Sequence, residues 1–107
     1  MKSYSYKNFQ IEILYGCSKL AMMHATKIMA NEFSNYKIKV NGICPNATNT
    51  KMLKKMSSKS RDALISRSFM KKACEPIDIA NLILYLSSKN SEHINGQIIY
   101  MDGGMDC

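Results

Sequence analysis

Several features that would place this 107-residue chain in other classes of protein are missing from it. It has no run of about 18 to 20 apolar residues, which is the length that a membrane-spanning helix requires. Its first ten residues, Met1 to Gln10, lack the apolar segment of a secretory signal. These absences predict a soluble, cytoplasmic chain that does not associate with membranes.

Paired cysteines are also missing. The four cysteines are Cys17, Cys44, Cys74 and Cys107, and no two of them form a Cys-x-x-Cys pair. In a chain without an export signal, such residues are expected to be reduced thiols, most of them small buried hydrophobes. His24 and His93 stand alone, so the short ligand spacing of a zinc site is absent and we predict no metal.

What is present is the composition of one domain that buries apolar surface. Hydrophobic residues make up 46% of the chain and charged residues 21%, which is too apolar for a disordered protein. The length suits a single core. No repeat or Gly/Ser/Pro linker divides residues 1–107, so we treat them as one domain.

The net charge of +7 suggests a nucleic-acid partner as one hypothesis. Lysines are densest from Lys51 to Lys72, and a basic face there could bind phosphate backbones without reading sequence. Only Phe69 among the aromatic residues interleaves those lysines, which disfavours stacking on single strands. A solvated basic surface is therefore the favoured interpretation, and nucleic acid the weakest hypothesis.

The order of the expected elements is typical of a parallel α/β sheet. Residues 14–33 should form one long helix that is apolar on more than one stripe and must be covered on several faces. A strand over 37–44 is closed by Pro45, and a turn-rich loop follows at 45–50. The later elements are weak helices at 51–56 and 60–69, a helix opened by Pro76, a turn at Asn95-Gly96 and a strand at 97–101. Strands separated by helical crossovers predict parallel pairing.

One pair of residues indicates proton-transfer chemistry. Tyr15 and Lys19 are four residues apart, so on a helix they share one face. A cation beside a phenol favours the phenolate and lowers the tyrosine pKa toward a range useful for acid/base work. The spacing alone is weak support, because Tyr85 and Lys89 repeat it in a stretch best explained as a core-facing aromatic and a helix C-terminal cation.

The surrounding motifs resemble those of the short-chain dehydrogenase/reductase family. The run YGCSKLAMMHATKIMANEF, residues 15–33, resembles its active-site helix, and VNGICP, residues 40–45, its strand that leads into the cofactor loop. Residues 75–80, EPIDIA, resemble a late helix start, residues 84–88 its end, and residues 94–105 the last strand with its terminal Asp-Gly-Gly. These matches occur in the family's order and cover residues 15–107.

The resemblance implies roles for particular positions. Tyr15 matches the catalytic acid/base, and Lys19 matches the residue that lowers its pKa and hydrogen-bonds the nicotinamide ribose. Pro45, Asn46, Thr48 and Thr50 match the loop that passes over the nicotinamide of NAD or NADP. Asn46 replaces the usual glycine of that turn, and asparagine tolerates a left-handed backbone better than most residues. The family's substrate is an alcohol or carbonyl compound, partly enclosed by residues 47–74, whose lysines leave open either an acidic substrate or a solvated surface.

The resemblance also implies what residues 1–107 lack. The family's nucleotide-binding half, with its glycine-rich turn, would precede Tyr15 by more than a hundred residues, and no GxxxGxG or GxGxxG pattern occurs here. Only 14 residues precede Tyr15, and Ser3 is a candidate for the family's catalytic serine.

We therefore expect a partial Rossmann-like sheet of about two strands with long flanking helices. Parallel sheets are normally covered on both faces, and two strands are too few for an independently stable sheet without generous helix packing. The leading hypothesis is a truncated NAD(P)-dependent oxidoreductase that is inactive alone. The alternative is a non-catalytic subunit or oligomerisation module that associates through helix 14–33, either with a second copy or with a complementing N-terminal chain.

Overall fold

The computed structural model describes the backbone of residues 6–105 and the side chains of residues 13–105. Four helices and two strands follow one another along the chain, and no helix in these residues is long and apolar enough to span a membrane. The elements are α1 (Tyr6–Glu32), β1 (Gly42–Pro45), α2 (Lys51–Lys55), α3 (Ser58–Ser66), α4 (Pro76–Leu86) and β2 (Ile98–Met101). Short 3-10 turns lie at Ser34–Tyr36 and Lys89–Ser91.

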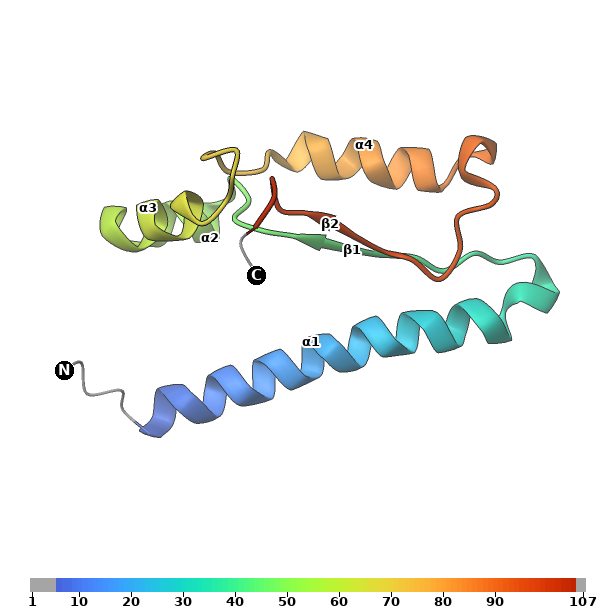
Figure 1. Ribbon diagram of the computed structural model, residues 1–107, viewed down its shortest axis with the longest axis horizontal. Coiled ribbons are helices and arrows are strands. Elements are labelled where there is room, and N and C mark those ends of the chain that lie inside the picture. Colours follow the sequence, from blue (N-terminus) through green and yellow to red (C-terminus); the bar gives the residue numbers. More distant parts are fainter. Residues whose placement is uncertain (1–5, 106–107) are drawn as a thin grey trace.

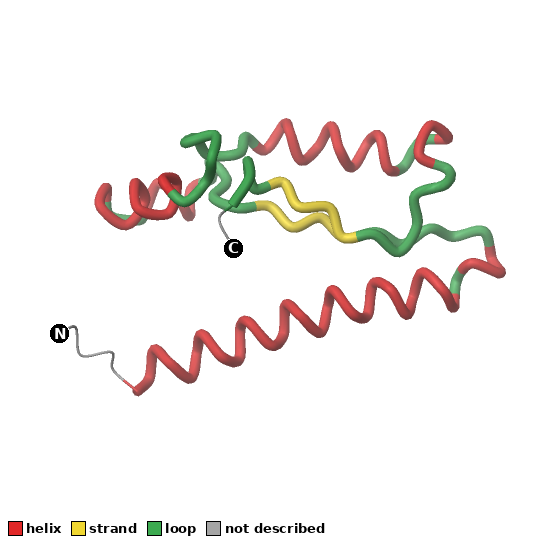
Figure 2. The backbone as a smooth tube through the Cα atoms, viewed as in Figure 1, coloured by secondary structure: helices red, strands yellow, loops and turns green. Residues whose placement is uncertain are grey.

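The two strands pair in parallel, with Gly42 opposite Ile98 and Pro45 opposite Met101. Figure 1 shows α4 on one side of the strands and α1 on the other, and the tube in Figure 2 shows the strand pair between these helices. Close approach to α1 occurs at Gly42, where an added Cβ would lie 3.6 Å from the Thr26 hydroxyl. The predicted α/β class, with two parallel strands and flanking helices, is confirmed.

Several predicted boundaries were wrong. The first strand occupies 42–45 instead of 37–44, because the residues before Gly42 bond to the Asn95-Gly96 turn rather than to a strand. Val40 N–H donates to Asn95 Oδ1 at 2.9 Å, and Gly96 N–H donates to the Val40 carbonyl at 2.8 Å. The long helix begins at Tyr6, eight residues before the predicted start, since residues 6–13 contain no proline or glycine. Its end at Glu32 is one residue from the prediction.

The packing leaves much apolar surface uncovered. The buried hydrophobic side chains among residues 13–105 are Ala30, Ala47 and Leu53. The accessible surface is 8891 Å², whereas a compact monomer of 12.1 kDa exposes about 6,000 Å². The radius of gyration is 16.6 Å, against about 13 Å for a compact chain of this length. The predicted multi-faced apolar character of the long helix is thus present, and most of that apolar surface is uncovered apart from the buried stretch at Thr26 and Ala30.

The terminal Asp-Gly-Gly motif, residues 102–104, follows β2 and forms hydrogen bonds with the residues just after α3. Gly103 and Gly104 have positive φ values, and their carbonyls accept hydrogen bonds from the N–H groups of Met70 and Phe69, at 3.1 and 2.8 Å. A Cβ on Gly103 would lie 2.5 Å from the hydroxyl oxygen of Ser68, which is 1% exposed. Glycine is therefore required at this position by both backbone conformation and space.

We expect Gly103→Ala to lower the free energy of unfolding by about 2 kcal/mol, through backbone strain and the clash with Ser68. Gly16→Ala is the matched control, because nothing lies within 4 Å of an added Cβ in the middle of α1. That substitution should instead stabilise the chain by about 0.5 to 1 kcal/mol. Urea unfolding of both variants measures the difference, and equal effects would contradict this account of the Asp-Gly-Gly motif.

Candidate active site

The structure places Tyr15 and Lys19 together on α1. The Lys19 ammonium lies 5.3 Å from the centroid of the Tyr15 ring, within the range of a cation–π contact. The Tyr15 side chain is 64% exposed, and Lys19 is exposed as well. The neighbouring Ser18 hydroxyl donates to the Tyr15 carbonyl at 2.7 Å and does not bond to the phenol or the ammonium.

This pair belongs to a stripe that continues along α1. Helical spacing puts Tyr15, Lys19, Met22, Thr26 and Ala30 within one arc of about 80°. Thr26, at 9% exposure, lies against Gly42 of β1, and Ala30, at 4% exposure, lies against Gly96 in the turn before β2. Met22 is 61% exposed, and the N-terminal half of α1 diverges from the sheet in Figure 1. The stripe therefore passes from a covered end to an uncovered end that carries the Tyr15–Lys19 pair.

The loop at residues 45–50 begins at the carboxyl end of β1. Asn46 N–H donates to the Met101 carbonyl at 3.3 Å, and Thr48 Oγ1 donates to the Asn46 carbonyl at 2.9 Å. Pro45 and Thr50 are exposed, and Thr50 precedes α2 without capping it through its side chain. Asn46 is not among the residues with positive φ, so the left-handed backbone considered for it from the sequence is not used.

The structure brings the predicted site residues to one end of the molecule in two groups. α1 runs opposite to the strands, so its N-terminal half lies toward the carboxyl ends of β1 and β2 (Figure 1). Asn49 fastens the loop to the start of α4: its N–H donates to the Cys74 carbonyl at 2.8 Å, and its side-chain amide to Glu75 at 3.2 Å. Between the described residues, no hydrogen bond joins the loop to Tyr15 or Lys19. The predicted serine, Ser3, lies outside the described residues.

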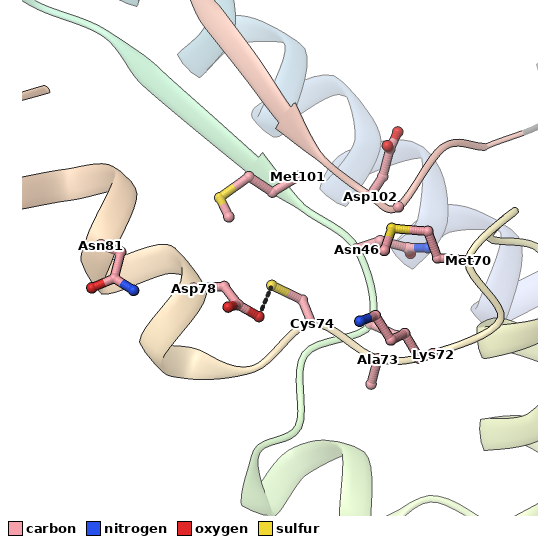
Figure 3. A pocket seen from close by; sticks show the side chains of 11 residues that line it. Asn46, Met70, Lys72, Ala73, Cys74, Asp78, Asn81, Met101 and Asp102 are labelled. Carbon is pink, nitrogen blue, oxygen red and sulfur yellow. Dashed lines mark hydrogen bonds between the residues drawn. The ribbon is translucent and has the colours of Figure 1, made fainter. Parts of the chain in front are cut away.

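An open cavity of about 470 Å³ lies beside the loop. Its lining comes from three segments: the loop, the stretch before and within α4, and the end of β2. The polar residues that line it are Asn46, Lys72, Cys74, Asp78, Asn81 and Asp102. Figure 3 shows Asp78 and Asn81 on α4, with Cys74 directed toward Asp78. Of these polar residues, the sequence analysis identified only Asn46 as a site residue. The others could have been found from the rule that ligands bind at the edge where the carboxyl ends of parallel strands meet.

The surroundings of Cys74 in this cavity favour its protonated thiol. Its Sγ lies 4.0 Å from Asp78 Oδ2 and 3.6 Å from the Glu75 carbonyl oxygen. Partial burial raises the pKa of the Cys74 thiol, and the negative charges of Asp78 and Glu75 raise it further. Because the thiolate is the reactive form, this environment disfavours a nucleophilic role for Cys74. Asp78 is itself fixed, since its carboxylate accepts the Glu75 N–H at 3.0 Å at the start of α4.

Comparison with known proteins identifies the family of this chain. The family model described as enoyl-(acyl carrier protein) reductase matches residues 1–106. A 3-oxoacyl-[acyl-carrier-protein] reductase from Thermotoga maritima is 34% identical over 91 residues, covering 85% of this chain and 37% of the relative. A tropinone reductase homolog from Datura stramonium is 35% identical over 96 residues, covering 85% and 36%.

The fold is shared with solved structures as well. The crystal structure of a 3-oxoacyl-[acyl-carrier protein] reductase from Brucella melitensis matches with a TM-score of 0.81 and 27% identity, covering 85% of this chain and 34% of that one. The fold is thus the Rossmann type of this reductase. The chain belongs to the short-chain dehydrogenase/reductase family. It spans a little over a third of the length of the relatives it matches.

Proposed function

We propose that residues 13–105 supply the proton-transfer pair and the nicotinamide-side loop of an NAD(P)-dependent oxidoreductase that interconverts an alcohol and a carbonyl compound. The observation that carries this proposal is the placement of the Lys19 ammonium 5.3 Å from the Tyr15 ring on one face of α1. When bound, the nicotinamide cofactor supplies or accepts hydride at the carbonyl carbon. In the reductive direction, the Tyr15 hydroxyl, which lies beside the Lys19 ammonium, donates its proton to the carbonyl oxygen.

The residues present fit only the nicotinamide end of such a cofactor. The loop containing Pro45, Asn46, Thr48 and Thr50 follows a parallel strand at its carboxyl end, which is where ligands bind in open α/β sheets. None of the five glycines in residues 1–107 belongs to a phosphate-binding glycine pattern. The proposal therefore assigns the nucleotide platform to a part outside these residues.

The unpaired edge of β1 and the exposed apolar surface of α1 support a partner that covers them. Gly42 and Asn46 donate their N–H groups toward β2, so the Ile43 N–H and carbonyl point to the opposite edge. No strand among residues 6–105 pairs with that edge. We propose that a nucleotide-binding half adds its strands there and covers α1, whether it belongs to a longer chain or to another polypeptide. The second candidate, self-association through residues 14–33, is favoured by the exposed Leu14 and Leu20.

We propose that the protein works in a reducing compartment such as the cytoplasm, and its free thiols support this. Cys17, Cys44 and Cys74 are free cysteines in the described part of the chain. Structural disulfides are typical of secreted proteins and rare in the cytosol.

The purified 107-residue chain is expected to show no NADH or NADPH oxidation with a 3-oxoacyl thioester. Its proton-transfer pair has no nucleotide platform to work against. Absorbance at the nicotinamide band measures this directly, with the Thermotoga maritima relative as the positive control. Robust turnover by the chain alone would overturn the assignment of the nucleotide platform to a separate part.

A further inference from the structure

Asn95 joins three segments at the amino end of the sheet. It is half-buried in the turn before β2. Its Oδ1 accepts the Val40 N–H just before β1 at 2.9 Å, and its Nδ2 donates at 3.3 Å to the Ala30 carbonyl, in the last turn of α1 where carbonyls lack a partner within the helix. Between described residues, the bond to Ala30 is the only hydrogen bond from α1 to any part of the chain after residue 34. One side chain therefore ties α1 to the strand pair.

Asn41 completes this junction from the other strand. Its Nδ2 donates to the Ile94 carbonyl at 3.0 Å, and its Oδ1 accepts the Gln97 N–H at 3.0 Å. The Gly42 N–H donates to the Gln97 carbonyl at 2.8 Å. These bonds reach the chain on both sides of Asn95 and hold its turn against the start of β1. We call the two asparagines and their hydrogen bonds the Asn41–Asn95 clasp.

The covered part of α1 is short and lies at the clasp. Gly96 has a φ of +68°, and a Cβ added to it would lie 3.3 Å from the Ala30 Cβ, so glycine at this turn allows α1 to approach closely. Thr26, one helical turn before Ala30, lies against Gly42. No side chain of α1 between residues 13 and 25 is buried. The contacts that set the direction of α1 are therefore concentrated at its carboxyl end.

Tyr15 lies far along α1 from the clasp, so a small change of direction moves it a long way. Fifteen residues separate it from Ala30, which is about 22 Å of helix at 1.5 Å per residue. A rotation of about 5° at the clasp would therefore displace Tyr15 by about 2 Å. Misplacement of a reacting group by about 1 Å can lower a rate about 10²-fold. The direction of α1 is thus a quantity on which proton transfer by Tyr15 depends.

We propose that Asn95 is a positioning residue for the reaction. Its bond to the Ala30 carbonyl fixes α1 against the strands, and α1 in turn places the Tyr15–Lys19 pair opposite the loop at residues 45–50. Asn95 lies at the other end of the strands from that loop, so it acts through α1. This inference rests on the proposed oxidoreductase function. Its first test measures the direction of α1 rather than turnover, so that its failure can be told apart from failure of the proposed function.

Residual dipolar couplings of the 107-residue chain measure the direction of α1 relative to the strands. Asn95→Asp keeps an acceptor for the Val40 N–H but sets a carboxylate oxygen against the Ala30 carbonyl. We expect it to turn α1 by at least about 5°, the rotation that displaces Tyr15 by about 2 Å, with the strand couplings unchanged. Asn31→Ala is the control, because Asn31 is an exposed residue of α1, and it should change neither. An unchanged α1 in Asn95→Asp, or loss of the strand couplings as well, would overturn the proposal.

The kinetic test uses residues 1–107 preceded by the part of the Thermotoga maritima relative that lies before its matched segment. There, Asn95→Asp should lower kcat at least about tenfold, whereas KM for the dinucleotide should change less than about threefold, because the nucleotide platform lies outside α1. Asn31→Ala should leave both within about twofold. An unchanged kcat in Asn95→Asp, or a loss that lies wholly in KM, would contradict a positioning role. If the unsubstituted protein shows no turnover, the proposed function fails, and the dipolar couplings still decide whether Asn95 directs α1.

Discussion

Replacing Tyr15 by phenylalanine should lower kcat by about 10²- to 10⁴-fold, the usual contribution of a positioned general acid. The assay requires a protein with a nucleotide platform. We define the joined protein as residues 1–107 preceded by the part of the Thermotoga maritima relative that lies before its matched segment. Because the Tyr15 ring is 64% exposed, loss of one hydroxyl should change the free energy of unfolding by no more than about 0.5 kcal/mol.

Tyr85→Phe is the matched control for this substitution. Tyr85 also has a lysine four residues later, Lys89, but it lies on α4 and its hydroxyl donates to the Asn90 carbonyl at 3.3 Å. Its removal should leave kcat within about threefold of the unmodified joined protein. A joined protein that keeps its rate after Tyr15→Phe, or loses as much after Tyr85→Phe, would show that the Tyr15–Lys19 pair has no special part in proton transfer.

Joining the nucleotide-binding half to residues 1–107 should also raise the melting temperature. The accessible surface exceeds that of a compact monomer of this mass by about 2,900 Å². At about 25 cal/mol per Å², covering even a few hundred Å² of apolar surface contributes several kcal/mol, as much as the net stability of many domains. We expect the joined protein to melt at least about 15 °C above the 107-residue chain, measured by circular dichroism.

Met22→Asp tests which face of α1 is covered. Met22 continues the stripe of the buried Thr26 and Ala30 but is 61% exposed in this chain. In the 107-residue chain the substitution should cost less than about 0.5 kcal/mol, whereas in the joined protein a buried, unpaired carboxylate should cost about 3 kcal/mol or more. Met52→Asp, at a position 79% exposed on α2, should cost little in both. A cost for Met22→Asp that is equally small in both proteins would mean that this face stays open.

Local sequence signals predicted the parts of the structure that depend on local rules. The four-residue spacing placed Tyr15 and Lys19 on one helix face, and Pro76 marked the first residue of α4. The prediction of a strand over 37–44 was wrong because its first residues alternate between polar and apolar side chains, as in a strand, yet have no neighbouring strand to pair with. A distant turn, through the Asn95 side chain, supplies their hydrogen-bond partners instead. Alternation in sequence cannot show which partner a backbone group will find.

The cavity shows a second limit of prediction from sequence. Lys72, Cys74, Asp78 and Asp102 come together only because β1 and β2 are parallel and α4 starts at the same edge. No spacing along the chain relates Asp102 to Asp78. Similarly, Asn46 was considered for a left-handed turn, whereas the left-handed non-glycine residues in the described range are Lys37 and Lys71. Such backbone choices are decided by neighbouring segments rather than by the residue itself.

The central claim is that residues 1–107 hold the proton-handling side of an oxidoreductase and depend on another part for the nucleotide. The most direct measurement is NADPH and NADH oxidation by the joined protein, beside an equal concentration of the 107-residue chain. The account predicts turnover by the joined protein and none by the chain. A joined protein that folds and binds the dinucleotide but transfers no hydride to any 3-oxoacyl thioester or ketone would contradict it.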